Sequence, residues 1–398
     1  MSSYWLTTPL IQGSRADPKD GEIVIVGSGL SGVSVAYWLY KYGFRNITIV
    51  DDEASKAASY RNCGHILNGT VESMQALCSL HGEEVARDIW SYSVSVCDLV
   101  GETVNELGID VEYARNGYLV MAIDTAEDQE IIASVELLNK HGFSSRYVHK
   151  FELEKMGFRA VTGGRFEASS AQAHPVKFRN GLLSYLLKNG VSYHSGVDVG
   201  SVDEANGKVV VTTLDAKAYK FDAAVIAANA YSPLLSKFFA DHKLVEPFKG
   251  QIITSRPLKS STLINYPHSF DHGYEYALRT ADNRLMIGGW RNNTPKGEVG
   301  SFDSTVNPAV EEGLKKFADK HYFLNEKLDW EYSWAGVMAT SATGFPFIGP
   351  TNSPTIFTLA GYTGHGFSWA HGSGQLLAKI MVGKSIPEVS KYFDPCNK

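Results

Sequence analysis

The sequence predicts an α/β protein, with a doubly wound domain of mostly parallel strands interleaved with an α+β domain built on an antiparallel sheet. Residues 22–43 contain a short buried strand, a glycine-rich turn and a helix, in that order. Short strands of the buried, parallel type recur at 221–228 and 355–359, far apart in the chain. Longer runs at 249–256 and 273–290 alternate as antiparallel strands do. One domain assembled from several segments explains this order better than two sequential domains.

The interleaving divides the chain into two discontinuous domains. We expect the doubly wound domain to consist of residues 15–85, 150–232 and 335–398. Residues 86–149 and 233–334 would form the antiparallel domain. The length of 398 residues suits two such units.

Apolar periodicity and helix-stopping glycines predict the remaining elements. Helices are expected at residues 31–43, 71–108, 127–141, 178–190, 308–321 and about 368–382. Further strands are expected at residues 47–50, 191–199 and 208–213. The strand–helix–strand unit at the beginning of the chain should have a right-handed crossover.

Composition and charge exclude several classes of function. The net charge is -6, and the sequence contains no basic stretch. Both observations argue against nucleic acid as a partner. The four cysteines have no CxxC and no spacing typical of a metal site, so we expect free thiols and no bound metal. The longest apolar stretches have strand length, and no leader begins the chain, so we expect no membrane span and a cytoplasmic protein.

The glycine-rich turn has the pattern GxGxxG, with Gly27, Gly29 and Gly32. The first glycine permits the tight turn, the second lets a pyrophosphate approach, and the third lets the helix pack closely on the strand. Leu30 and Ser31 stand at the start of the expected helix, whose free N–H groups and positive dipole end face the phosphates. The pattern therefore predicts a bound dinucleotide in a Rossmann-like domain.

An acidic residue in the expected place supports this interpretation. Asp51 lies 19 residues beyond Gly32, at the end of the second strand, where a carboxylate accepts hydrogen bonds from ribose hydroxyls. Asp52 follows it directly and is a second candidate for the same contact. An acidic residue there disfavours a 2′-phosphate and hence NADP. NAD and FAD share the turn, so the rest of the chain must distinguish them.

Three further motifs carry a resemblance to a known family. The chain begins with Ser-Tyr-Trp-Leu at residues 3–6, has Ser-x-Arg-Asn-x-Gly at 59–64 after the second strand, and has Gly-Tyr-Thr-Gly-His-Gly at 361–366 before the last helix. It resembles the D-amino-acid-oxidase-like superfamily of FAD-dependent oxidoreductases, of the glycine and sarcosine oxidase type, and most closely gamma-glutamylputrescine oxidase-like proteins. The resemblance covers nearly the whole chain. It implies FAD as the cofactor, whereas an NAD dehydrogenase would need the turn near the carboxyl end to be a coincidence.

The resemblance also implies which further residues contact FAD. The loop after the second strand should run along the pyrophosphate and the flavin with Ser59, Arg61, Asn62, Cys63, Gly64 and His65. The turn near the carboxyl end should contact the flavin with Gly364, His365, Gly366 and Phe367. Isolated contacts are expected at Val197 beside the adenine, at Ala228 in a second cofactor turn, and at Gly336. N–H groups of the last helix would face the flavin edge where negative charge accumulates on reduction.

The expected chemistry is oxidation of a C–N bond. FAD accepts a hydride from a carbon beside an amine nitrogen, so the protein must position that C–H bond, keep the amine neutral and exclude water. The candidate catalytic residues are His365 in the turn, Tyr274 and Tyr276 on one face of a strand, and Arg291 as a cation for a substrate carboxylate. No acid–base pair is strictly required.

Departures from the family's pattern leave the substrate open. Amino-acid oxidases have an arginine after Trp-x-Gly, but Trp334-Ala335-Gly336 is followed by valine and methionine. Where sarcosine oxidases have lysines that help oxygen react, this chain has Met286 and Ser368. The substrate class is therefore an amine, a gamma-glutamyl amine, or a residue inside a partner protein, as in maturation of a quinone cofactor. A flavin-binding protein without catalysis is a further alternative.

Overall fold

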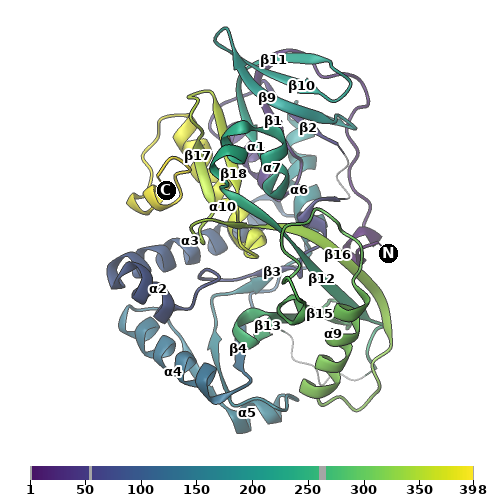
Figure 1. The fold of residues 1–398 in the computed structure, drawn as a ribbon, viewed down its shortest axis with the longest axis vertical. Coiled ribbons are helices and arrows are strands. Elements are labelled where there is room, and N and C mark those ends of the chain that lie inside the picture. The colour runs from purple at the N-terminus through teal and green to yellow at the C-terminus, as the bar shows by residue number, and fades with distance from the viewer. Residues whose placement is uncertain (1, 53–55, 260–265, 398) are drawn as a thin grey trace.

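The computed structural model describes residues 2–52, 56–259 and 266–397 and places them in two large sheets with helices around them (Figure 1). The first sheet has the path β17-β18-β11-β1-β2-β8, with β10 and β9 continuing from β11. Its strands are β1 (Gly21–Val26), β2 (Ile47–Asp51), β8 (Ser192–Ser195), β9 (Val199–Ala205), β10 (Lys208–Thr213), β11 (Ala218–Ile226), β17 (Phe347–Pro350) and β18 (Ile356–Ala360). The second sheet has the order β16-β12-β15-β14-β13-β4-β6-β5.

The strands of the second sheet are β4 (Tyr118–Ala122), β5 (Arg146–His149), β6 (Gly163–Glu167), β12 (Val245–Ser255), β13 (His268–Phe270), β14 (Glu275–Arg279), β15 (Leu285–Gly288) and β16 (Trp330–Ser341). A small third sheet pairs β3 (His65–Ile66) with β7 (Ala171–Gln172). The helices are α1 (Leu30–Lys41), α2 (Met74–His81), α3 (Glu83–Leu107), α4 (Thr125–Lys140), α5 (Lys150–Lys155), α6 (Pro175–Lys188), α7 (Ser232–Leu235), α8 (Lys237–His242), α9 (Pro308–His321) and α10 (Gly366–Met381).

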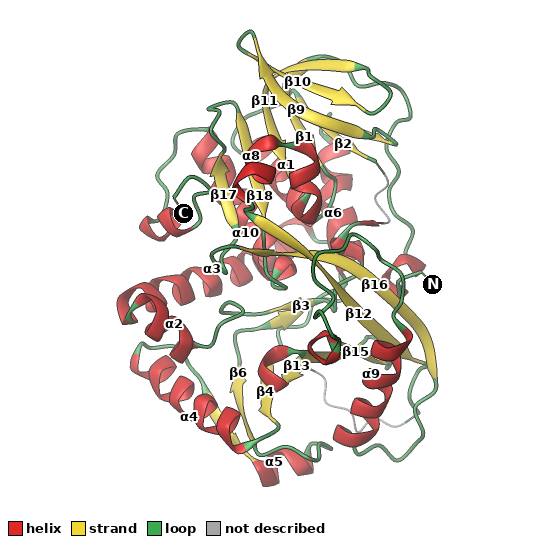
Figure 2. Ribbon diagram, in the orientation of Figure 1, coloured by secondary structure: helices red, strands yellow, loops and turns green. Residues whose placement is uncertain are grey.

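The first sheet confirms the predicted α/β class. β1 pairs in parallel with β2 and β11, and β18 pairs in parallel with β11, so segments from both ends and the middle of the chain lie side by side (Figure 1). One face carries Ile23 and Ile25, which pack into the core made with the buried faces of α1, α3, α6 and α10. The opposite face carries Val24 and Val26, which pack against Val209 of the hairpin β9–β10. Antiparallel strands therefore cover this second face, at the top of Figure 2.

Three predicted elements have different bounds in the structure, and a local feature explains each difference. The expected helix over 71–108 is two helices, because Gly82 has φ 84° and breaks it between α2 and α3. The expected strand over 191–199 is also two strands, because Gly196 with φ 80° separates β8 from β9. The helix expected at 178–190 begins earlier, at Pro175, where His174 accepts a hydrogen bond from the N–H of Lys177.

The sheets also bear on the proposed domain boundaries, which remain a proposal. β6 lies in the second sheet, although residues 150–232 are expected in the cofactor domain. β16 extends to Ser341 within the same sheet, beyond the boundary at residue 335. Conversely, most of α3 was expected in the antiparallel domain, but its buried residues join the core of the first sheet. No helix among the described residues is long and apolar enough to cross a lipid bilayer.

Candidate active site

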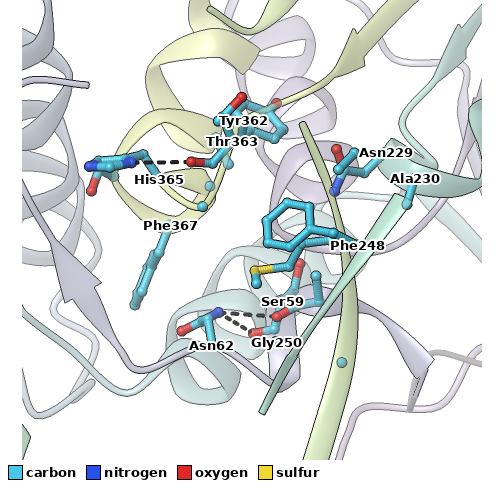
Figure 3. Close-up of a pocket in the computed structure, with 18 of the residues that line it drawn as sticks. Ser59, Asn62, Asn229, Ala230, Phe248, Gly250, Tyr362, Thr363, His365 and Phe367 are labelled. Carbon is cyan, nitrogen blue, oxygen red and sulfur yellow. Dashed lines mark hydrogen bonds between the residues drawn. The ribbon is translucent and has the colours of Figure 1, made fainter. Parts of the chain in front are cut away.

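A cavity of about 860 Å³ lies between the two large sheets. Its walls come from the glycine-rich turn after β1, the loop before β3, the turn before α10, and strands β12, β14 and β16. All of the predicted site residues line it except Gly32 and Gly64. Figure 3 shows Ser59, Asn62 and Phe248 on one side of the cavity and the turn with Thr363 and His365 on the other. The volume lies within the usual range for cofactor and ligand sites.

The glycine-rich turn is built as the sequence predicts for a phosphate cradle. Gly27 has φ 111°, and a Cβ there would lie 2.7 Å from the carbonyl oxygen of Ala227. A Cβ on Gly32 would lie 1.8 Å from the carbonyl oxygen of Gly27, so this glycine serves close packing of helix on strand and does not face the cavity. Within the described residues no hydrogen bond is made by the N–H groups of Ser31 and Gly32, which leaves donors at the start of α1.

Asp51 lies at the edge of the cavity beneath this turn. Its carboxylate accepts a hydrogen bond from the N–H of Ser28, and the side chain is buried. Burial raises the pKa of Asp51, and the hydrogen bond from Ser28 acts in the opposite direction. Asp52 also lines the cavity, so both acidic residues are available to ribose hydroxyls.

A buried arginine that the sequence did not indicate supports the same turn from behind. Arg179 on α6 is fully buried, and its Nε and Nη2 donate to the carbonyl oxygen of Ser28 at 3.1 Å and to its hydroxyl at 3.0 Å. The guanidinium also lies 5.3 Å from the centre of the Tyr193 ring and donates to its hydroxyl. No motif marks this residue, because the contact joins segments about 150 residues apart.

The loop before β3 is held in place by its own side chains and by two tryptophans. The indoles of Trp5 and Trp334 donate to the carbonyl oxygens of Asn62 and Arg61. Ser59 accepts from the N–H of Leu30 at 2.8 Å and so joins the loop to the start of α1. Gly64 has φ 78°, and a Cβ on it would lie 2.8 Å from the carbonyl oxygen of Ala173. Gly64 therefore packs against the backbone behind the cavity wall.

Cys63 and His65 face the cavity from this loop. Burial raises the pKa of the Cys63 thiol, so it stays protonated. Burial lowers the pKa of His65 to about 3, so its ring is neutral at ordinary pH. Because His65 Nε2 lies 3.0 Å from the carbonyl oxygen of Ala277, that nitrogen carries the proton and Nδ1 is left as an acceptor.

The turn before α10 meets the glycine-rich turn directly. The hydroxyl of Ser31 donates to the hydroxyl of Tyr362 at 2.9 Å. Gly364 has φ 88°, and His365 is the residue that precedes the first turn of α10. Burial lowers the pKa of His365, and its Nδ1 lies 3.5 Å from the carbonyl oxygen of Thr363. The first N–H groups of α10 thus open at the cavity, as the expected contact with the flavin edge requires.

The remaining predicted cofactor residues also lie on the cavity wall. Val197 donates its N–H to the carbonyl oxygen of Asp51, and Ala228 follows β11 next to Asn229. The side-chain oxygen of Asn229 accepts from the N–H of Gly361, a contact that the sequence did not indicate. A Cβ on Gly336 would lie 2.7 Å from Cβ of Arg61, so this glycine leaves room for the arginine.

The predicted catalytic residues of the second domain come together on one side of the cavity. The expectation that Tyr274 and Tyr276 share one strand face is wrong, because Tyr274 has helical backbone angles and precedes β14. Tyr274, Tyr276 and Arg291 all line it. The Arg291 guanidinium lies over the rings of Phe248 and Tyr274, 4.7 and 5.2 Å from their centres. Phe248 and Met338, paired across β12 and β16, add an apolar surface beside them.

Glu275, between the two tyrosines, predicts a dependence of stability on pH. Burial, with the negative charges of Asp271 and Glu127, raises its pKa from 4.5 to about 8. The protonated form is therefore favoured in the folded state, and the stability that it contributes is present below pH 4.5 and lost as pH rises through 8. We expect Glu275→Gln to remove this loss, by up to about 1.4 kcal/mol per pH unit within that window.

Urea unfolding of wild type and variant at pH 5, 6.5 and 8 measures the effect. The exposed Glu246 of β12, replaced by glutamine, is the matched control and should leave the pH profile unchanged. Parallel profiles for wild type and the Glu275 variant would contradict the prediction.

The structure adds cavity residues that no sequence motif indicated. Arg165 and Tyr118, on β6 and β4, line the end of the cavity beyond Tyr276. Glu127, Asp271 and His272 lie close enough together that their ligand atoms fall within 4.8 Å of one another. The oxygens of Glu127 accept the N–H groups of Ile123 and His272, which explains its burial, and we assign no metal to this group.

A mostly parallel sheet with its glycine-rich turn at the cavity, joined to a mostly antiparallel sheet that faces the same cavity, defines the architecture of a dinucleotide-binding oxidoreductase. The chain belongs to the family DAO, FAD dependent oxidoreductase, whose model matches residues 22–380. Its cofactor is FAD, and the cradle of glycines, free N–H groups and acidic residues fits that molecule.

Comparison with known proteins agrees with this family. The chain is 24% identical over 380 residues to a probable oxidoreductase, OrdL, of Haemophilus influenzae, which covers 94% of this chain and 85% of the relative. The fold is similar to that of glycine oxidase from Geobacillus kaustophilus, with a TM-score of 0.80, 20% identity and coverage of 95% and 98% of the two chains. It is also similar to iminodiacetate oxidase from Chelativorans sp. BNC1, with a TM-score of 0.75, 18% identity and coverage of 94% and 99%.

Proposed function

We propose that this FAD-dependent oxidoreductase oxidises the C–N bond of a small primary or secondary amine, with a gamma-glutamyl amine as one candidate. The observation that carries the proposal is the single cavity that the two glycine-rich turns share with Tyr274, Tyr276 and Arg291. Bound FAD supplies the hydride acceptor for a carbon beside an amine nitrogen. The relatives named glycine oxidase and iminodiacetate oxidase, which have the same fold, support a substrate of this class.

The residues of the cavity would bind and orient the amine. Neutral His65 offers Nδ1 to an N–H of the uncharged amine, since its Nε2–H is directed to Ala277. The Tyr276 ring lies 6.2 Å from the His65 ring and would close the site against water. Arg291 remains the proposed contact for an anionic group at the apolar wall, and His365 the proposed contact at the flavin turn.

Anaerobic mixing of the FAD-loaded protein with gamma-glutamylputrescine, sarcosine and glycine, each in turn, tests the proposal. Because hydride transfer reduces the flavin, we expect the yellow absorbance to bleach with at least one amine. The matched alcohols, which lack the nitrogen, should leave the absorbance unchanged. A flavin that stays oxidised with every amine would remove the proposal and favour a flavin-binding protein without catalysis.

Two other predictions remain proposals beside this one. A side chain of a partner protein is the alternative substrate, and it finds no support in the comparisons, which name small molecules. Co-purification with one defined polypeptide, together with no turnover of free amines, would favour it. We also propose a cytoplasmic location, and fractionation of cells of the source organism would test this.

A further inference from the structure

One row of residues across the second sheet faces the cavity. Tyr276 of β14 lies opposite Ser269 of β13, Ser269 opposite Val120 of β4, and Val120 opposite Arg165 of β6. Directly opposite residues share a face of the sheet, and all four line the cavity. Three strand spacings separate the ends of the row, so the Cα atoms of Tyr276 and Arg165 are roughly 14 Å apart.

The guanidinium of Arg165 is fixed in place and has one open edge. The side chain is 9% exposed, and its guanidinium lies over the ring of Trp90, 5.7 Å from the ring centre. Its Nε lies 2.8 Å from a carboxylate oxygen of Glu167. In the part of the chain that the structure describes, Nη1 and Nη2 of Arg165 make no hydrogen bond. Nε of Arg165 is fully buried, whereas Nη1 and Nη2 are not. The edge with these two nitrogens therefore opens into the cavity.

We propose that Arg165 binds a carboxylate of the substrate through two parallel hydrogen bonds from this edge. The inference rests on the proposed function and specifies its substrate class. A planar guanidinium matches a carboxylate in two-point contact, and a buried one holds it more firmly than an exposed one. The chain thus has a carboxylate-binding arginine on β6, although the position after Trp334-Ala335-Gly336 has none.

The position of Arg165 separates the carboxylate from the bond that is oxidised. The Tyr276 hydroxyl lies 3.5 Å from the Cβ position of Gly250, and Gly250 lies directly opposite Gly336, an expected flavin contact, in the pairing of β12 with β16. The flavin-facing end of the row is therefore the Tyr276 end, and Arg165 is at the other. The substrate is an amine whose carboxylate is several bonds from the oxidised carbon.

Glu167 pairs with Nε of Arg165 and leaves the Nη1 and Nη2 edge open. The Glu167 carboxylate lies close to Nε of Arg165, but the two groups are not aligned for a hydrogen bond. Nε of Arg165 and Oε1 of Glu167 are both buried and have no hydrogen-bond partner among the described residues. Arg291, by comparison, lies between two aromatic rings and directs Nη1 toward the carbonyl oxygen of Gly297 at 3.4 Å. Of the three arginines among the described residues that line the cavity, Arg61 and Arg291 each direct Nη1 to a carbonyl oxygen, whereas Arg165 makes no hydrogen bond with either Nη atom.

Calorimetric titration of the FAD-loaded protein with glutarate tests the site without any turnover. We expect Arg165→Met to weaken glutarate binding by ~10- to 100-fold, because two hydrogen bonds to a charged group are lost. Arg146→Met is the matched control, since Arg146 lies on the neighbouring strand β5, is exposed and pairs with Glu152. Equal binding by wild type and the Arg165→Met variant would overturn the proposal.

Two further variants keep the test decisive if the methionine variant does not fold. Arg165→Lys keeps the charge but not the two-point contact, and should weaken glutarate binding by ~10-fold. Glu167→Gln removes the competing negative charge and should tighten binding. Unchanged binding in the lysine variant, or weaker binding in the glutamine variant, would count against the proposal.

A series of amines separates this proposal from the proposed function. The series contains glycine, 4-aminobutyrate and 6-aminohexanoate, beside alkylamines of the same lengths that have no carboxylate. Arg165→Met should raise KM for the longer carboxylates and leave KM for the alkylamines unchanged. Equal effects on both sets would overturn the role of Arg165. If no amine reduces the flavin while glutarate still binds through Arg165, the proposed function fails and the carboxylate site stands.

Discussion

Replacing Gly32 with alanine is expected to abolish FAD binding. The added Cβ would lie 1.8 Å from the carbonyl oxygen of Gly27, a backbone atom that cannot move without opening the turn. The turn would separate from α1, and the N–H groups that face the pyrophosphate would lose their positions. We expect FAD affinity to fall by at least ~100-fold and the free energy of unfolding by about 3 kcal/mol or more.

The ratio of flavin to protein absorbance after reconstitution with FAD measures this effect, and thermal unfolding follows the stability. Gly21→Ala, at the start of the same strand, is the matched control. A Cβ there would meet a side-chain oxygen of Asn46 at 3.1 Å, which can move aside. An alanine variant of Gly32 that is as yellow as wild type would show that the turn does not hold the cofactor.

Replacing Arg179 with methionine is expected to have the second large effect. Its guanidinium donates to the carbonyl oxygen and the hydroxyl of Ser28, to the carbonyl oxygen of Ile11 and to the hydroxyl of Tyr193. Methionine fills similar space but donates no hydrogen bond, so the carbonyl oxygen of Ile11 loses its donor, while the carbonyl oxygen of Ser28 keeps only the hydroxyl of Tyr60. We expect a loss of about 3 kcal/mol or more in the free energy of unfolding, and weaker FAD binding as the turn around Ser28 loosens.

Urea unfolding, with and without added FAD, separates the two parts of this prediction. Lys188→Met, on the exposed end of the same helix, is the matched control and should change neither quantity. An Arg179 variant that is as stable as wild type and binds FAD equally well would show that Arg179 does not stabilise the turn around Ser28.

The cofactor half of the site could be predicted because its signals are local. The spacing of Gly27, Gly29 and Gly32 reports backbone geometry within six residues, and the preceding strand and following helix complete a unit of about thirty. The places where prediction failed are also local in origin. Gly82 and Gly196 each take a positive φ that breaks an element, and a glycine does not reveal from sequence which conformation it will adopt.

The substrate half could be predicted only in part, because its residues meet through strand pairing. Tyr274, Tyr276 and Arg291 were expected in the cavity and line it, although their catalytic roles remain predictions. Arg165 gave no signal, since an arginine on a short strand between glycine and phenylalanine resembles an ordinary solvent-facing residue. Only the pairing of β6 with β4 turns it toward the cavity.

The sequence by itself determined the α/β class and the dinucleotide turn, because the strand, turn and helix that signal them lie close together in the chain. FAD rather than NAD followed from the family resemblance that the motifs at 59–64 and 361–366 carry. The tertiary structure alone decided that Arg179 supports that turn, that Glu275 is buried, and that Arg165 lines the cavity. The physical reason is that burial and charge pairing depend on which distant strands become neighbours, and side-chain periodicity does not specify those neighbours.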